Sequence, residues 1–440
     1  MLVLDDTRKP LRRSTRLTSA RIAAASIVVT CILGGCSADS NPRPTAVDDR
    51  WWRGNLHTHS LWSDGDEYPE VILEWYKSRG YDFVAMSDHN TLAEGERWID
   101  VVPSRGVSIE RYADLFGDEW VETREGESGV QVRLKTFAEY QGRVEVPGQF
   151  IVIQSEEISD SFDAKPIHVN ATNVREKIEP QGGSSVQAVL QNNVDAVLDQ
   201  RVRTQQPMFP HINHPNFGWA LTVEDMIPLV GERFFEVYNG HPAVHNEGDE
   251  HRPSSERIWD IVLAERLRAG NEIMYGIAVD DAHSYQEMDT TLANPGRAWV
   301  MVRADTLTPA TLVAALEAGD FYASTGVVLE DVLLVDGALS VLVRPELGVR
   351  YRTMFVGTRA GYDSARVAVE DPDGSTTRYR YGDDIGEVFA ESNGNAAHYQ
   401  LRGDELYVRA VVISTKPKQN PYRPGEVEMA WTQPVVLRGR

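Results

Sequence analysis

Short apolar runs alternate with amphipathic helical patterns between residue 51 and about residue 320. The runs expected to form strands are Trp52–Leu56, Phe83–Met86, Phe150–Ile153, Ile167–Asn170, Met208–Ile212, Phe234–Tyr238, Ile273–Val279 and Ala298–Val302. The expected helices are Val71–Ser78, Val186–Leu198, Ser255–Ala269 and the segment from Pro309 to Gly319. Strands that alternate with helices form mainly parallel sheets or barrels, so the pattern predicts an α/β fold. Its length of about 270 residues suits one TIM-like barrel domain.

Two regions depart from this alternation. Residues 91–148 contain the charged stretch Asp118–Glu127 and no clear strand–helix unit, so we expect an insertion, with a hairpin, that overhangs one end of the barrel. After about residue 325, short β-like runs flank turns such as Asp336-Gly337, a typical hairpin signal. We therefore expect a barrel domain at residues 51–325 and a small all-β, sandwich-like domain at residues 326–440.

The first 36 residues have the pattern of an export signal. Basic residues precede the uncharged run Ile22–Gly35, which is too short for a comfortable transmembrane helix. Leu33–Cys36 resembles a bacterial lipobox, in which the cysteine becomes the lipidated N-terminus. An ordinary cleaved signal, an uncleaved anchor and a twin-arginine signal at Arg12-Arg13 are the alternatives. With a polar tether at residues 37–50, the sequence predicts an exported bacterial lipoprotein, anchored at the membrane and facing the periplasm or the cell exterior.

Charge limits the partners of this chain. It has 44 basic and 66 acidic residues, a net charge of −22. A general nucleic-acid-binding protein needs a basic surface to displace counterions, so no nucleic-acid partner is expected. Membrane contact is expected through the lipid anchor alone. The sequence makes no prediction of oligomeric state.

Side chains able to bind metal ions follow the expected strands. His57 and His59 come after the first strand, where residues two apart point to the same side and can bind one ion. Asp281 and His283 repeat this spacing after the seventh strand. The other candidates at strand ends are Asp64, His89, Glu156, Glu157, His168 and His214. Strand C-termini gather at one face of a βα barrel, so these groups should converge there. Imidazole and carboxylate ligands suit Zn²⁺, Mn²⁺ or Fe²⁺.

Several short motifs resemble those of the PHP family (polymerase and histidinol phosphatase). They are Asn55–Ser60, Ser63–Gly65, Ser87–Asn90, Ser155–Ser159, Asn213–Pro215 and Asp280–Ser284. The resemblance covers roughly residues 51–325. It implies a distorted seven-stranded (β/α) barrel that holds two or three divalent metal ions.

The same resemblance implies the ligands of each ion. The first ion would be bound by His57, His59, Glu157 and Asp281. A second would share Glu157 and add His168 and His214. A third would take Asp64, His89 and His283. Asp64 stands where some family members have histidine, and Glu157 is preferred over Glu156 as the ligand.

Hydrolysis of a small-molecule substrate, above all a phosphoester, is the activity that the resemblance implies. A hydroxide held between adjacent ions would attack the substrate. Asp281 is expected to accept the proton of the water, and His283 or His241 to protonate the leaving group. Hydrolysis of a carboxylic ester, amide or carbamate at the same site stays open, as does a non-catalytic surface binding protein. Two further expectations concern single residues. Arg297 is expected at the surface, with a bidentate contact to a substrate phosphate as the alternative. His211 is not expected to bind metal.

Overall fold

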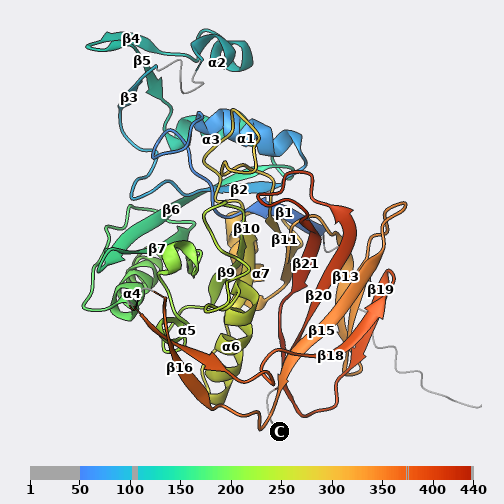
Figure 1. Cartoon of the computed structure of the whole chain (residues 1–440). Coiled ribbons are helices and arrows are strands. Elements are labelled where there is room, and N and C mark those ends of the chain that lie inside the picture. The colour runs from blue at the N-terminus through green and yellow to red at the C-terminus, as the bar shows by residue number, and fades with distance from the viewer. Residues whose placement is uncertain (1–49, 102–107, 373, 375, 438–440) are drawn as a thin grey trace, which may run out of the picture. The chain divides into compact units, whose positions relative to one another are not determined.

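The computed structural model describes residues 50–101, 108–372, 374 and 376–437 (Figure 1). The expected signal peptide at 1–36 and nearly all of the tether lie outside the described residues. Within the described ranges, no helix combines the length and the apolar character needed to cross a membrane.

A large mixed sheet forms the centre of the fold. Its first strands, in spatial order, are β10 (Tyr275–Val279), β9 (Phe234–Asn239), β8 (Phe209–Ile212), β7 (Lys165–Thr172), β6 (Ile151–Phe162), β2 (Phe83–Met86), β1 (Arg50–Asn55), β11 (Trp299–Ala304) and β12 (Phe321–Ser324). Each of the eight apolar runs expected to form a strand overlaps one of these strands, with ends that differ by at most two residues where the run extends beyond the strand. The prediction of a mixed helix and strand architecture is therefore confirmed.

The pairing in this sheet is not mainly parallel. Strand β2 pairs in parallel with β1 and β6, but β7 is antiparallel to both of its neighbours. Strands β6 and β7 are joined by a tight turn at Asp163-Ala164, where φ is +48° and +62°. A turn of this length connects antiparallel strands only, because a parallel pair needs a crossover of a dozen residues or more. The expectation of a mainly parallel sheet is wrong for β7 and its two neighbours.

The segments that follow β1 and β10 lie side by side. Thr58 and Ala282 form an isolated parallel bridge, and the His59 N–H donates to the Ala282 carbonyl at 3.0 Å. The Asp281 N–H donates to the His57 carbonyl at 3.1 Å. These bonds join the segment after β10, the strand at one end of the sheet, to the segment after the interior strand β1, at the place where the candidate ligands lie. Among the described strands, β1 and β10 share no further pairing, so a closed barrel of seven strands stays a prediction.

The main helices agree with the expected ones within a few residues. They are α1 (Pro69–Ser78), α4 (Val186–Thr204), α6 (Ser255–Arg268) and α7 (Pro309–Ala318). Side-chain oxygens of Ser185, Ser254 and Thr308 cap the N-termini of the last three. The short elements η2 (Phe217–Trp219) and α5 (Val223–Met226) follow β8.

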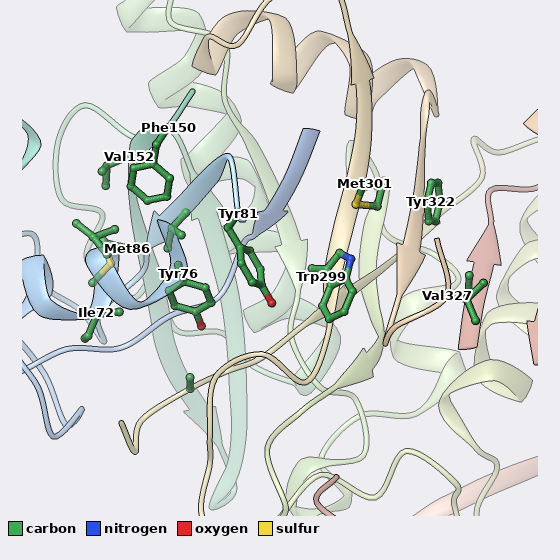
Figure 2. Packing of buried hydrophobic residues seen from close by; sticks show 14 of the residues in the cluster. Ile72, Tyr76, Tyr81, Met86, Phe150, Val152, Trp299, Met301, Tyr322 and Val327 are labelled. Carbon is green, nitrogen blue, oxygen red and sulfur yellow. The ribbon is translucent and has the colours of Figure 1, made fainter. Parts of the chain in front are cut away.

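The insertion is a small α/β unit that packs against α1. It contains β3 (Arg97–Asp100), α2 (Ile109–Phe116), β4 (Thr123–Gly126), β5 (Gly129–Leu134) and α3 (Phe137–Val144). Strands β4 and β5 form the expected hairpin. Tyr112, Val132 and Tyr140 of this unit belong to the same buried apolar cluster as Tyr76 and Phe150, part of which Figure 2 shows. The insertion therefore shares a core with the large sheet.

Part of the C-terminal region continues the large sheet. The strands that join it are β15 (Tyr351–Arg359), β18 (Glu387–Asn393), β20 (Glu405–Pro417), β21 (Val427–Thr432) and β22 (Val435–Val436). A separate three-stranded sheet contains β13 (Leu329–Val335), β14 (Ala338–Val343) and β19 (Ala396–Gln400), and a two-stranded sheet contains β16 (Arg366–Glu370) and β17 (Thr377–Tyr381). Strand β12 pairs with β21, which pairs with β20. A separate β-sandwich is not confirmed, because hydrogen bonds run across the expected boundary. The boundary at residues 325 and 326 stays a prediction.

A buried ion pair joins α6 to β20. The Arg409 guanidinium, 1% exposed, donates to both carboxylate oxygens of Asp260 at 2.9 and 2.7 Å. We predict that Arg409→Met lowers the free energy of unfolding by about 3–5 kcal/mol, because Asp260 would stay buried without its partner. Arg359→Met, which removes the more exposed pair with Asp404, should lower it by less than about 1 kcal/mol. Urea denaturation measures both values, and equal small losses would contradict the prediction.

Candidate metal centre

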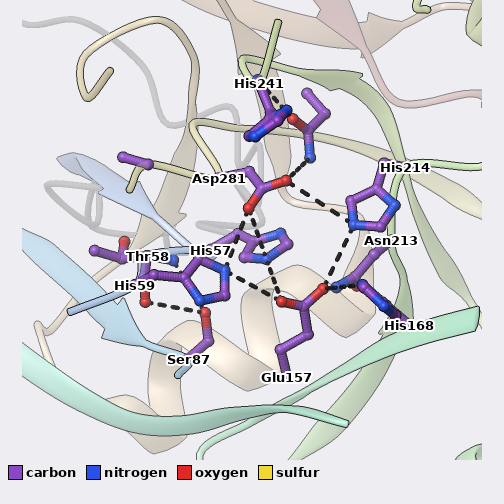
Figure 3. Close-up of polar contacts among 12 residues, drawn as sticks. His57, Thr58, His59, Ser87, Glu157, His168, Asn213, His214, His241 and Asp281 are labelled. Atoms are coloured by element: carbon purple, nitrogen blue, oxygen red, sulfur yellow. Dashed lines mark hydrogen bonds and ion pairs between the residues drawn. The ribbon is translucent and has the colours of Figure 1, made fainter. Parts of the chain in front are cut away.

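Glu157, on β6, lies between two groups of histidines and is fully buried (Figure 3). Its Oε2 is 3.2 Å from His57 Nε2 and 3.1 Å from His59 Nε2. Its Oε1 is 2.9 Å from His168 Nδ1 and 3.4 Å from His214 Nε2. One carboxylate therefore faces ring nitrogens from three different parts of the sheet.

The first group is completed by Asp281. Its Oδ1 is 3.2 Å from both His57 Nε2 and His59 Nε2. The two Nε2 atoms and Glu157 Oε2 are buried, yet none of them forms a hydrogen bond with a described group, and the nearest further nitrogen is His89 Nδ1, 2.9 Å from Glu157 Oε2. Four donors bound tetrahedrally at about 2.0–2.1 Å would lie roughly 3.3 Å apart, close to the separations found here. The unpaired atoms and their spacing thus fit a divalent metal ion, and no cysteine follows Cys36 to offer a thiolate instead.

The second and third groups share residues with the first. His168 and His214 approach Glu157 Oε1, which also accepts a hydrogen bond from Asn213 Nδ2 at 2.6 Å. Asp64 is 3.4 Å from His283 Nε2 and 3.5 Å from His89 Nε2. His59, Asp64, His89 and His283 offer ligand atoms close enough to hold an ion. The structure therefore brings together all the residues that the sequence nominates as ligands.

The neighbouring glutamates have opposite orientations. Glu157 faces the histidines, whereas Glu156 Oε2 accepts a hydrogen bond from the Ile178 N–H at 2.8 Å. Successive side chains of a strand point to opposite faces, so only one of the pair can reach the centre. The geometry favours Glu157.

A supporting layer lies behind the ligands, and its contacts with them were not predicted. Glu236, on β9, is buried, and its Oε1 lies 2.7 Å from His57 Nδ1. His211 Nε2 lies 3.3 Å from the same oxygen. Asn239 Nδ2 donates to Glu236 Oε2 and to Asp281 Oδ2, at 2.8 and 3.0 Å. The one available signal in the sequence was a carboxylate inside the apolar run Phe234–Tyr238.

Charges within the cluster shift its pKa values. Burial alone would raise the pKa of Glu157 and of Asp281, but His57 and other histidines hold both pKa values well below normal. Burial would lower the pKa of His57, but Asp281, Glu157 and Glu236 raise it well above its usual value. The carboxylates are therefore ionised at neutral pH, as metal ligands must be.

The Asp281 backbone is held in an unusual conformation. Its φ is +50°, in the left-handed region that residues with a side chain rarely adopt. Such a conformation costs roughly 1–3 kcal/mol and persists where neighbouring bonds fix it. Here those bonds are the Asp281 N–H to the His57 carbonyl and Asn239 Nδ2 to the carboxylate.

A pocket of about 770 Å³ opens from the cluster. The lining residues include Asp64, His89, Glu157, His168, His214, Phe217, His241, Pro242, Asp281, His283, Leu292 and Tyr422. The expected surface position of Arg297 is wrong. It is fully buried, and its guanidinium donates to the carbonyls of Gly240, Leu292, Asp289 and Asn420. These bonds join three segments at the pocket wall.

Two pocket histidines differ in tautomer. His241 Nδ1 accepts a hydrogen bond from the Ala243 N–H at 3.1 Å, so the neutral ring carries its proton on Nε2. His283 Nδ1 lies 2.9 Å from the Asp281 carbonyl and must donate to it, which leaves the lone pair of the neutral ring on Nε2, facing Asp64. Burial lowers the pKa of His241 to about 4. His241 is thus a neutral hydrogen-bond donor, whereas neutral His283 offers a ligand nitrogen.

No protein-family model matches the chain, and no curated protein matches it. Among solved structures, a two-domain protein from Bacteroides vulgatus that contains a predicted PHP-like metal-dependent phosphoesterase is 14% identical. That match covers 88% of this chain and 95% of the other, with a TM-score of 0.38. An amidohydrolase from Chromobacterium violaceum is 13% identical over 52% of this chain and 87% of its own, with a TM-score of 0.27.

Glu236 offers a test of the supporting layer. We predict that Glu236→Gln weakens binding of a divalent ion by about 10–100-fold, because a neutral amide no longer supports the charge and orientation of His57. The matched control is Glu232→Gln, a buried glutamate just before β9 whose Oε1 binds the Phe234 N–H. Competition with a chromogenic chelator measures the affinity. Equal affinities in the two variants would contradict the prediction.

Proposed function

We propose that this protein is a metal-dependent hydrolase of the PHP type, and that its substrate is a small-molecule phosphoester. The observation that carries the proposal is the position of Glu157, whose two carboxylate oxygens face separate sets of histidines. Two adjacent metal sites need a carboxylate that both can share. The proposal also agrees with the motif resemblance, and it takes two or three divalent ions per chain.

Each ion would be held by the groups already described. His57, His59, Glu157 and Asp281 would hold the first; Glu157, His168 and His214 the second; Asp64, His89 and His283 the third. Bound ions of this kind make a water molecule more acidic and neutralise charge on phosphoryl oxygens.

The residues of the chain have separate roles in the proposed reaction. Water attacks phosphorus, the bond to the leaving oxygen breaks, and an alcohol and phosphate are released. Asp281, ionised and fixed by Asn239, would accept the proton of the water. Of the two histidines considered for the leaving group, His241 would be the hydrogen-bond donor to the leaving oxygen, because its Nε2 carries a proton while His283 Nε2 faces Asp64. The neutral ring would keep that proton, and the alcohol would take up the proton that Asp281 accepted from the water.

A second candidate is hydrolysis of a carboxylic ester, amide or carbamate. The observation that favours it is the absence of lysine and arginine among the described residues that line the pocket. A neutral substrate needs no such side chain. A non-catalytic binding protein and a lipid-anchored, exported location also stay proposals, the latter because residues 1–36 lie outside the described ranges.

Metal content and turnover test the proposal together. For protein that lacks residues 1–36, we predict two or three divalent ions per chain by elemental analysis and turnover of 4-nitrophenyl phosphate esters. His57→Ala and Glu157→Ala should each lose metal and lower kcat/KM at least about 100-fold. His398→Ala, an exposed histidine on β19, is the control and should change neither value. Turnover of carboxylic esters alone would favour the second candidate, and little bound metal with unaffected variants would overturn the catalytic proposal.

His241 gives an independent test. We predict that His241→Ala lowers kcat about 100-fold, whereas His241→Gln, which keeps an N–H donor, loses less. Since the pKa of His241 is about 4, the ratio of wild-type to His241→Gln kcat should stay constant between about pH 6 and 8. His245→Ala is the control, because that ring stacks on Trp219 outside the pocket lining. A ratio that falls as the pH rises from 6 to 7 would show instead that His241 acts as a general acid with an ordinary histidine pKa.

A further inference from the structure

The pocket has an apolar part next to its ligand cluster. Phe217 follows β8, Pro242 follows β9, Leu292 follows β10, and Tyr422 lies between β20 and β21. Phe217 also contacts the ring of His241, with centroids 6.0 Å apart. Four segments that are distant in sequence thus supply apolar surface to one pocket.

Charge in the pocket is restricted to the groups that could bind metal. The described lining residues include Asp64, Glu157 and Asp281 but no lysine or arginine. Arg297, behind the lining, donates to four backbone carbonyls and is fully buried. The described lining residues therefore offer no cationic side chain to an anionic group beyond the reacting centre. The cations close to Tyr422 lie outside the lining and are already paired, Arg423 with Glu247 at 2.8 Å and Lys418 with Glu426 at 3.7 Å.

Tyr422 is fixed in place rather than loosely exposed. Its Oη accepts a hydrogen bond from Asn246 Nδ2 at 3.0 Å and donates to Glu247. Asn246 in turn pairs with the backbone of Asn239 through both its side-chain atoms, at 3.1 and 2.8 Å. Asn239 holds the Asp281 carboxylate. A short chain of hydrogen bonds therefore connects the ring of Tyr422 to the candidate catalytic carboxylate.

We propose that the apolar part of the pocket binds the leaving group, and that the substrate is a phosphoester whose leaving group is uncharged and aromatic or similarly apolar. Tyr422, supplied by the C-terminal segment, is the specificity-determining residue. This inference rests on the proposed function. It adds the chemical class of the substrate and a role for the C-terminal residues in the same site.

A matched pair of substrates tests the charge preference. Phenyl phosphate and 4-carboxyphenyl phosphate differ in one distal carboxylate. With the metal-loaded protein we expect kcat/KM, measured by phosphate release, to be at least about tenfold higher for phenyl phosphate. Calorimetric binding of phenylphosphonate and 4-carboxyphenylphosphonate, which have no ester bond to break, should show the same order. Equal or reversed preference in both measurements would overturn the inference.

Variants at Tyr422 test the residue assignment. We expect Tyr422→Ala to reduce the ratio of kcat/KM for phenyl phosphate over ethyl phosphate about tenfold, because the aromatic contact is lost. Tyr422→Phe keeps the ring and should keep most of the preference. Tyr379→Ala removes a half-buried tyrosine of β17 outside the pocket lining and should leave the ratio unchanged. An unchanged ratio in Tyr422→Ala, with the protein folded by circular dichroism, would overturn the assignment.

Failure of this inference can be separated from failure of the proposed function. Hydrolysis of all the esters at similar rates, lost in Glu157→Ala, would keep the function and reject the substrate class. Absence of all phosphoester hydrolysis would reject the function. In that case, binding of the two phosphonates still tests the inference. Preferential binding of phenylphosphonate would support the apolar pocket, and equal binding would reject it.

Discussion

The buried carboxylates of Glu157 and Asp281 are the constraint on which the rest of the structure depends. An ionised carboxylate is costly to bury unless opposite charge and hydrogen bonds surround it. His57 and His59 lie 3.1–3.2 Å from both side chains. Several ligand atoms remain buried without a hydrogen bond, so the histidines alone do not satisfy the site. The arrangement fits the protein ligands of a metal ion.

The ligand side chains are held in place by residues that do not line the pocket. Glu236 bonds His57 Nδ1 and so directs Nε2 toward the centre, while Asn213 bonds Glu157 Oε1. Such second contacts fix the tautomer and orientation of metal ligands. Backbone bonds add to this, because the Thr58–Ala282 bridge brings the segments after β1 and β10 together. The positions of the ligands therefore depend on residues and strands that are distant from them in the sequence.

The sequence revealed the local elements well and the long-range pairing poorly. Bounded apolar runs such as Phe83–Met86 were found with the right limits, since burial on both faces leaves a clear pattern. Strand β6 extends to Phe162 through polar residues that pair with β7, which no apolar run could show. Candidate ligands could be nominated because histidine and carboxylate at strand ends carry a recognisable chemistry. The role of Glu236 could not be predicted, because it depends on a contact with His57, 179 positions away.

The continuation of the sheet beyond β12 changes how the C-terminal residues are understood. Strand β12 pairs with β21, and Arg297 binds the Asn420 carbonyl two residues before Tyr422. These contacts fix the position of Tyr422 relative to the pocket. The same guanidinium binds the carbonyls of Gly240 and Leu292, next to other parts of the wall. One buried cation thus sets the relative positions of three pocket segments. Its N–H groups donate to backbone carbonyls, so this guanidinium is not free to bind a substrate anion.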